Sequence, residues 1–316
     1  PVLLMDLLFL GTSAAVPSRD RSTSCIALRE GSDIVLMDCG EGSQRQLMVS
    51  PFSFMRVGTV LITHLHGDHV FGLPGLIQTM GLSGRTGPLK IYGPAGIRSF
   101  VDASMAATEG EAGYSLEITE LSGGERFDIR GFSVECFRTD HGISSLGFVL
   151  RAPDRPGRLD HRKALELGIE DGPDMARLKS GEIVNGVRPE QVVGPAVKGM
   201  SVAYTGDTKP CKATIEAVRG VDVLIHEATY SDRESARAEE HNHSTAVQAA
   251  RIAEEAGVSY LIMTHISHRY EDRSVIEDEA REVFPQSYAA EDMELFTINR
   301  GGIAAKDLRQ ARLGRA

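Results

Sequence analysis

Three histidines and one aspartate lie within six consecutive residues in the first quarter of the chain. They belong to the run Thr63-His64-Leu65-His66-Gly67-Asp68-His69. Imidazole and carboxylate groups are preferred ligands of divalent transition metals, and an ordinary surface loop has no need for this spacing, so the run predicts a metal site. On extended backbone His64 and His66 point the same way, and Gly67 lets the chain turn before Asp68 and His69. This pattern favours two neighbouring metal positions.

The residues around this run predict the elements that hold it. The apolar, β-branched stretch 57–62 before it is typical of a buried strand. After it the chain turns and enters a helix to about Met80. The ligands are therefore expected on a tight loop at the carboxyl end of a core strand.

Four more predicted strands end in candidate ligands. They are 132–137 before His141, 200–204 before Asp207, 221–225 before His226 and Glu227, and 260–263 before His265. Open α/β proteins bind ligands at the edge where strands end, so these side chains are expected at one edge. A two-metal site also needs a bridging carboxylate, and Asp207 after Thr205-Gly206 suits that role.

The remaining patterns predict an α/β protein. Further strands are expected at 2–10, 25–29, 33–38, 89–92 and 146–151, and helices at 44–49, 97–107 and 244–256. In the last helix Thr245 and Gln248 have the spacing of a capping box, and Gly257 is its expected end.

Composition is that of an ordinary soluble globular protein, with 41% hydrophobic and 25% charged residues among 316. The net charge of −10 argues against bulk nucleic-acid binding but leaves room for a local basic groove. Four cysteines without a CxxC pair indicate a reducing, cytoplasmic setting. No run is long enough to span a membrane, and Asp6 interrupts the apolar start, which is typical of a strand rather than a signal peptide.

Residues 153–195 are rich in proline, glycine and charge, with short helical patterns at 161–167 and 175–178. Between Arg151 and Met200 there are nine Lys/Arg against eight Asp/Glu, so this part is less acidic than the rest. Long loops of this kind are functional or disordered. The expectation is one domain over 1–316 with residues 153–195 as an inserted flexible arm.

These motifs resemble the metallo-β-lactamase superfamily and, within it, the ribonuclease Z family of tRNA 3′-processing endoribonucleases. The resemblance rests on residues 9–17, 38–42, 63–69, 204–208, 226–229, 243–245 and 264–265. It implies a four-layer αββα sandwich with a protruding exosite arm.

The resemblance also implies a ligand set and catalytic roles. His64, His66 and His141 would hold one Zn²⁺, Asp68, His69 and His265 a second, and Asp207 would bridge them. Asp68 would also orient or deprotonate the attacking water. His243, positioned by Glu227, would protonate the leaving 3′-oxygen.

The implied activity is removal of the 3′ trailer from precursor tRNA, which leaves a 3′-hydroxyl on the tRNA and a 5′-phosphate on the trailer. The arm would grip the tRNA from the partner subunit of a homodimer. Candidate RNA contacts are Arg19, Arg21, Gly172, Pro173, Lys179 and Arg269. The family's Pro-x-Lys-x-Arg-Asn loop stands here at 17–22 with Arg19 for Lys and Ser22 for Asn.

Three other functions share parts of this pattern. A phosphodiesterase for small molecules would use the same metal ligands, but it has no need of the arm or the motifs at 226–229 and 243–245. A di-iron oxidoreductase would also use the ligand frame and would be revealed by iron. A non-catalytic RNA-binding or metal-binding protein would not need a complete ligand set.

Overall fold

The structure is a computed structural model that describes residues 5–129 and 131–309. The chain forms two compact units, one made of the chain up to Leu150 and again from Ser201, and the other of Arg151–Met200. Each unit has its own apolar core. Residues 2–4 of the first predicted strand lie outside the described residues.

The larger unit is built on two β-sheets. The eight-stranded sheet has the order β15 (Gly302–Asp307), β14 (Glu294–Asn299), β1 (Met5–Gly11), β2 (Cys25–Glu30), β3 (Asp33–Met37), β4 (Val57–Leu61), β5 (Leu89–Pro94) and β6 (Leu116–Leu121). The seven-stranded sheet has the order β13 (Ser287–Ala289), β12 (Tyr260–Thr264), β11 (Val223–Glu227), β10 (Ser201–Tyr204), β9 (Leu146–Arg151), β8 (Phe132–Arg138) and β7 (Arg126–Ile129).

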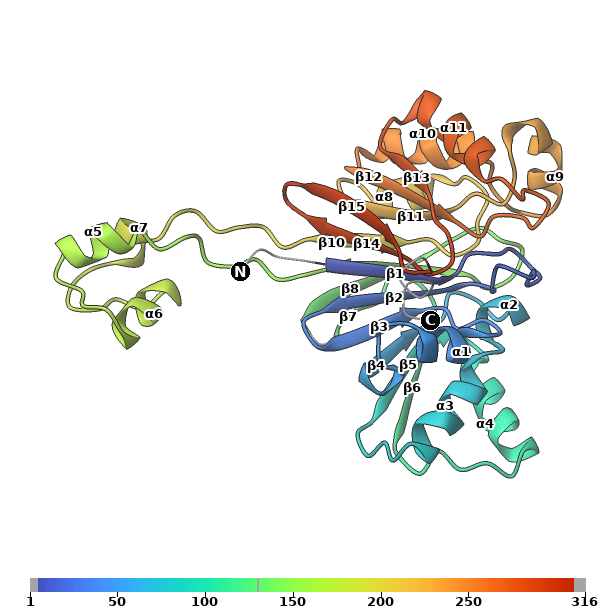
Figure 1. Ribbon diagram of the computed structural model, residues 1–316, viewed down its shortest axis with the longest axis horizontal. Coiled ribbons are helices and arrows are strands. Elements are labelled where there is room, and N and C mark those ends of the chain that lie inside the picture. The colour runs from blue at the N-terminus through green and yellow to red at the C-terminus, as the bar shows by residue number, and fades with distance from the viewer. Residues whose placement is uncertain (1–4, 130, 310–316) are drawn as a thin grey trace. The chain divides into compact units, whose positions relative to one another are not determined.

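The helices of the larger unit follow the strands of each half of the chain. Those of the first half are α1 (Ser43–Val49), α2 (Gly67–Val70), α3 (Leu73–Leu82) and α4 (Ile97–Ala107), with a 3-10 turn at Phe54–Arg56. Those of the second half are α8 (Lys212–Ala217), α9 (Ser235–Glu240), α10 (Ala246–Ala256) and α11 (Ser274–Val283), with a 3-10 turn at Asp232–Glu234. Helices α3 and α4 lie beyond one sheet and α10 and α11 beyond the other (Figure 1), which confirms the predicted αββα sandwich. Within the described residues, no helix has the length and apolar character to cross a membrane.

Strands β10, β11 and β12 bring several predicted site residues to one edge. They are buried on both faces, which explains their continuous apolar sequences. They run parallel, with Tyr204 opposite Ile225 and Ile225 opposite Ile262. Their carboxyl ends therefore coincide, as predicted.

Helix α10 begins and ends where the capping pattern predicts. The Thr245 hydroxyl accepts a hydrogen bond from the Gln248 amide at 3.2 Å, and the reciprocal bond is also present. Gly257 ends the helix with a φ of 65°, a left-handed conformation that favours glycine.

The smaller unit contains α5 (His161–Glu166), α6 (Pro173–Lys179) and α7 (Pro189–Val192), which confirms both predicted helical patterns. Seven buried apolar side chains form its core, namely Ala164, Ile169, Met175, Leu178, Val184, Val187 and Val192. Its two ends run antiparallel, with Arg155 opposite Val197.

Candidate metal centre

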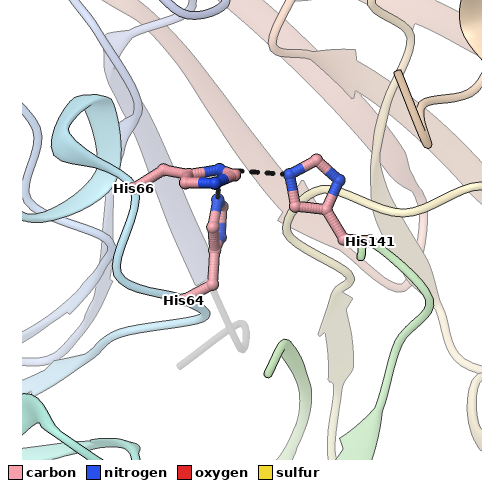
Figure 2. A group of neighbouring side chains, drawn as sticks. All are labelled: His64, His66 and His141. Carbon is pink, nitrogen blue, oxygen red and sulfur yellow. Dashed lines mark hydrogen bonds between the residues drawn. The ribbon is translucent and has the colours of Figure 1, made fainter. Parts of the chain in front are cut away.

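Three imidazole nitrogens meet after β4 and β8. The His66 Nδ1 atom lies 3.1 Å from Nε2 of His64 and 3.2 Å from Nε2 of His141, so the His66 ring lies between the other two (Figure 2). Ligand nitrogens around a tetrahedral zinc ion are about 3.3 Å apart, given Zn–N bonds of roughly 2.0–2.1 Å. The three side chains therefore have the spacing of one metal site.

Hydrogen bonds hold two of these rings, His141 and His64, with a free nitrogen toward the cluster. The His141 Nδ1 atom lies 2.9 Å from the backbone oxygen of Asn242, which can only accept. Nδ1 therefore carries the proton and Nε2 keeps a lone pair. The His64 Nδ1 atom is similarly 3.0 Å from the Thr63 hydroxyl, and such partners orient metal ligands.

Asp68, His69 and His265 form a second cluster beside the first. One oxygen of Asp68, Oδ2, lies 3.2 Å from Nε2 of His265 and 3.5 Å from Nε2 of His69. His265 has a φ of 53°, an uncommon conformation for a residue other than glycine. This bend follows directly after β12.

One oxygen of Asp207 faces both clusters. Its Oδ2 atom lies 3.2 Å from Nε2 of His265 and 3.3 Å from Nε2 of His69. The same atom is 3.7 Å from Nε2 of His64 and 3.7 Å from Nε2 of His141. A carboxylate in this position has the geometry of a bridging ligand.

Two buried polar atoms in this cluster have no hydrogen-bond partner among the described residues, Nε2 of His69 and Oδ1 of Asp207. Buried polar atoms without a partner are rare and costly. Metal ions bound to these atoms, once the proton on His69 has left, would remove that cost. The residues present therefore fit metal ions.

Asp38 holds His69 of the second cluster in place through a buried contact. Its carboxylate accepts hydrogen bonds from the Thr63 amide at 2.8 Å and from the Tyr204 hydroxyl at 2.8 Å, and lies 2.7 Å from Nδ1 of His69. Asp38 follows β3 with a φ of 58°. Sequence reasoning did not assign it a site role, although the stretch 38–42 was part of the family pattern.

Thr229 links the metal cluster to Glu227. Its hydroxyl lies 2.7 Å from Oε2 of Glu227 and 2.9 Å from Nδ1 of His265. Because the hydroxyl has one hydrogen, donation to the carboxylate leaves it an acceptor for a proton on His265 Nδ1. His265 Nε2 then has its lone pair toward Asp68 and Asp207. Thr229 had no predicted role of its own.

Glu227 is fully buried and holds His243. Its Oε1 atom lies 2.7 Å from Nδ1 of His243 and accepts from the Thr208 amide at 2.8 Å. Burial raises the pKa of Glu227, but the neighbouring His243 outweighs this and the pKa is lowered. Burial likewise opposes the charged form of His243, yet the Glu227 carboxylate raises the pKa of His243 to about 9.

The ligands differ in charge state. Burial and the neighbouring His69 lower the pKa of His64. For Asp68 burial favours the neutral form, but the neighbouring His265 and His69 side chains outweigh it and the pKa is lowered. In His69 burial is outweighed by the Asp207 and Asp38 carboxylates, which raise its pKa. A metal ion that binds His69 must displace this proton.

A cleft of about 980 Å³ opens onto the clusters. Its walls include six of the predicted site residues, namely His66, Asp68, His141, Asp207, His243 and His265. His64, His69 and Glu227 lie buried behind it. The structure thus brings all predicted metal and catalytic residues together in the larger unit.

The predicted RNA contacts do not lie together as the metal and catalytic residues do. The Arg21 guanidinium donates to the backbone oxygens of Ile266, Ser267 and Tyr270 at 3.0–3.2 Å. Arg19 is exposed and lines a separate cavity of about 510 Å³ together with Arg21.

The other predicted contacts lie elsewhere. Arg269 lies over the Tyr230 ring at 5.1 Å from its centroid. Gly172, Pro173 and Lys179 belong to the start and end of α6 in the smaller unit.

Comparison with known proteins identifies the family. Ribonuclease Z from Methanosarcina mazei is 41% identical over 295 residues, which cover 92% of this chain and 97% of the relative. The chain belongs to the ribonuclease Z family. Ribonuclease Z from Anoxybacillus flavithermus is also 41% identical, over 308 residues that cover 94% of this chain and 99% of the relative.

Family models and solved structures also match this chain. The model described as "Anti-Pycsar protein Apyc1" matches residues 5–155, and that of the "Beta-lactamase superfamily domain" matches residues 159–266. The crystal structure of human tRNase Z, short form, has a TM-score of 0.68 and 30% identity, and covers 92% of this chain and 98% of that chain. YhfI from Bacillus subtilis has the same TM-score at 19% identity and shows the fold alone.

Proposed function

We propose that this chain is a zinc-dependent endoribonuclease that removes the 3′ trailer from precursor tRNA, leaving a 3′-hydroxyl on the tRNA and a 5′-phosphate on the trailer. The observation that carries the proposal is the Asp207 oxygen that faces two ligand clusters. It occurs in a chain about 41% identical to ribonuclease Z over nearly its whole length.

Seven residues would hold two zinc ions per chain. His64, His66 and His141 would bind one, Asp68, His69 and His265 the other, with Asp207 between them. When bound, two such ions lower the pKa of a water molecule and neutralise charge on a phosphodiester.

Asp68 has the position of a group that orients the attacking water. Its Oδ2 atom accepts a hydrogen bond from the Ala15 amide at 2.9 Å, which fixes the carboxylate at the cleft wall. The lowered pKa keeps it ionised. A fixed, ionised carboxylate can accept a proton from water.

His243 is the proposed donor of a proton to the leaving 3′-oxygen. Its side chain is 14% exposed and lines the cleft, and Glu227 keeps it protonated at neutral pH. Glu227 is a positioning residue because it is fully buried behind His243.

We further propose that the chain is one metallo-β-lactamase-fold domain with residues 153–195 as an inserted flexible arm. In a homodimer this arm would grip tRNA through Gly172, Pro173 and Lys179, and Arg19, Arg21 and Arg269 would make further contacts. The cytoplasm is the proposed location, supported by four free cysteines, three of them buried. Light scattering of the purified protein tests the dimer.

The decisive experiment is incubation of the zinc-loaded protein with a 3′-extended precursor tRNA, followed by mapping of the cut and of both new ends. We expect one cut at the trailer junction, and a loss of about 10³-fold or more in Asp68→Ala, since acid–base groups alone contribute roughly 10²–10⁴. The alternative is a small-molecule phosphodiesterase. Hydrolysis of bis-p-nitrophenyl phosphate without tRNA cleavage would favour it.

A further inference from the structure

Phe71 is an exposed aromatic side chain at the metal centre. It is 64% exposed, the one exposed phenylalanine among the described residues. It ends α2, two residues after His69, and lines the same cleft as His66 and Asp68. Exposed apolar side chains that gather in one cleft, as Phe71, Val16 and Ile143 do, mark binding grooves.

The ring is held in place although it is exposed. A Cβ atom at position 67 would overlap the Phe71 ring, so the ring lies directly against the Gly67 backbone. The Phe71 amide donates to the Gly67 oxygen at 2.9 Å. The Phe100 ring stacks beside the Phe71 ring, with 6.4 Å between the two ring centroids. The glycine of the metal motif therefore also makes room for an aromatic ring, which loses little freedom when a ligand binds.

The charges around the cleft favour an uncharged group against this wall. Among the described residues, no lysine or arginine lines the cleft, whereas the exposed Glu41 and Glu240 do. These carboxylates repel a phosphate backbone. Val16 and Ile143 add exposed apolar surface to the same cleft.

We propose that Phe71 stacks on the base of a nucleotide next to the scissile phosphate. The proposal rests on the proposed function, because the base belongs to the RNA whose phosphate reaches the metal centre. Unpaired bases of RNA bind aromatic side chains by stacking, irrespective of sequence. Phe71 thus aligns the strand while the metal ligands act on its phosphate.

The test compares Phe71→Ala, Phe71→Leu and Phe71→Trp on a 3′-extended precursor tRNA. Base stacking predicts a loss of about 5- to 150-fold in kcat/KM for Phe71→Ala. Phe71→Trp should stay within about twofold of wild type, because its larger ring stacks equally well. Leu82→Ala is the matched control, since Leu82 is 92% exposed and lies outside the cleft; it should cleave like wild type.

Two further substrates carry an abasic nucleotide on one side of the cut or the other. One of them should slow wild type by a factor similar to that of Phe71→Ala, and Phe71→Ala should lose nothing more on it. Equal losses for Phe71→Ala on all three substrates, or no loss on the intact one, would overturn the proposal.

Zinc content and thermal unfolding are measured for each variant. If Phe71→Ala loses zinc or unfolds, the folded Phe71→Leu decides, because it keeps apolar packing without an aromatic face; wild-type rates in that variant would overturn the proposal. If wild type itself does not cut precursor tRNA, the proposed function fails and stacking with it. If wild type cuts precursor tRNA and the Phe71 variants cut it equally fast, the proposed function stands and the stacking proposal fails.

Discussion

The Nδ1 atom of His69 lies 2.7 Å from Oδ2 of Asp38, and both side chains are fully buried. This contact turns Nε2 of His69 toward Asp68 and Asp207. The buried Asp38 carboxylate thus orients a metal-ligand candidate behind the cleft, and carboxylate partners of this kind also raise the basicity of the imidazole.

Asp38→Asn should weaken zinc binding by about 10- to 100-fold, because the partner of a ligating histidine loses its charge. Competition with a chelator measures the affinity. Asp128→Asn is the matched control, since Asp128 is exposed on β7 and should bind zinc like wild type. Unchanged affinity in Asp38→Asn would mean that the charge of Asp38 does not support metal binding by His69.

Zinc added to metal-free protein at neutral pH should bind near two ions per chain and release protons. The release follows from the raised pKa of His69, which is protonated before an ion displaces its proton. Titration calorimetry in buffers of different ionisation enthalpy measures both numbers. One ion per chain at full activity would contradict the bridging position of Asp207.

Cleavage should decline as the pH rises through about 9, because His243 then loses the proton it donates. Glu227→Gln removes the charge that raises this pKa, so the alkaline limb of the kcat profile should move to lower pH. His243→Ala should slow cleavage by about 10²- to 10⁴-fold and lose that limb. Zinc analysis is the control: loss of zinc from His243→Ala would make His243 a ligand.

Arg19 and Arg21 should behave differently although both were predicted RNA contacts. Arg21→Ala removes three hydrogen bonds to residues 266–270 and should lower the free energy of unfolding by about 2 kcal/mol, since bonds from a charged group contribute roughly 1.5–3. Arg19→Ala should leave thermal unfolding unchanged and weaken tRNA binding only. Equal unfolding temperatures of Arg21→Ala and wild type would show that the Arg21 contacts do not stabilise the fold.

Replacement of residues 153–195 by a short Gly/Ser linker should leave the core folded and metal-bound. The segment has its own apolar core, and its ends lie side by side, with the Arg155 amide 2.9 Å from the Val197 oxygen. Hydrolysis of a small phosphodiester should persist, while tRNA cleavage falls and the salt dependence of tRNA affinity becomes shallower. A parallel loss of both activities would make the arm part of the fold.

The sequence was sufficient to predict the residues that end buried strands. Asp207, Glu227 and His265 follow apolar stretches, and parallel pairing brings such ends together. The capping box of α10 is local and was equally visible. The strands β6, β7, β13, β14 and β15 and the helices α7, α8, α9 and α11 were not predicted. Short strands depend on their partners more than on their own sequence.

Roles that depend on distant contacts could not be predicted. Asp38 meets His69 and Tyr204, which are 31 and 166 residues away. Arg21 is a cation in a loop of the family pattern, yet its guanidinium binds carbonyl groups 245–249 residues away. No spacing in the sequence reveals such pairs.

Asp38 and His265 both adopt left-handed backbone conformations beside the metal centre. The conformation costs about 1–2 kcal/mol for a residue other than glycine, and less for Asp38, whose short side chain tolerates it. Glycine or asparagine would fit at His265 at less cost. The chain keeps side chains here that heat resistance alone would not favour. Laboratory evolution for a higher melting temperature, without selection for RNA cleavage, should therefore replace His265 early. The resulting variants should unfold at a higher temperature and lose RNA cleavage.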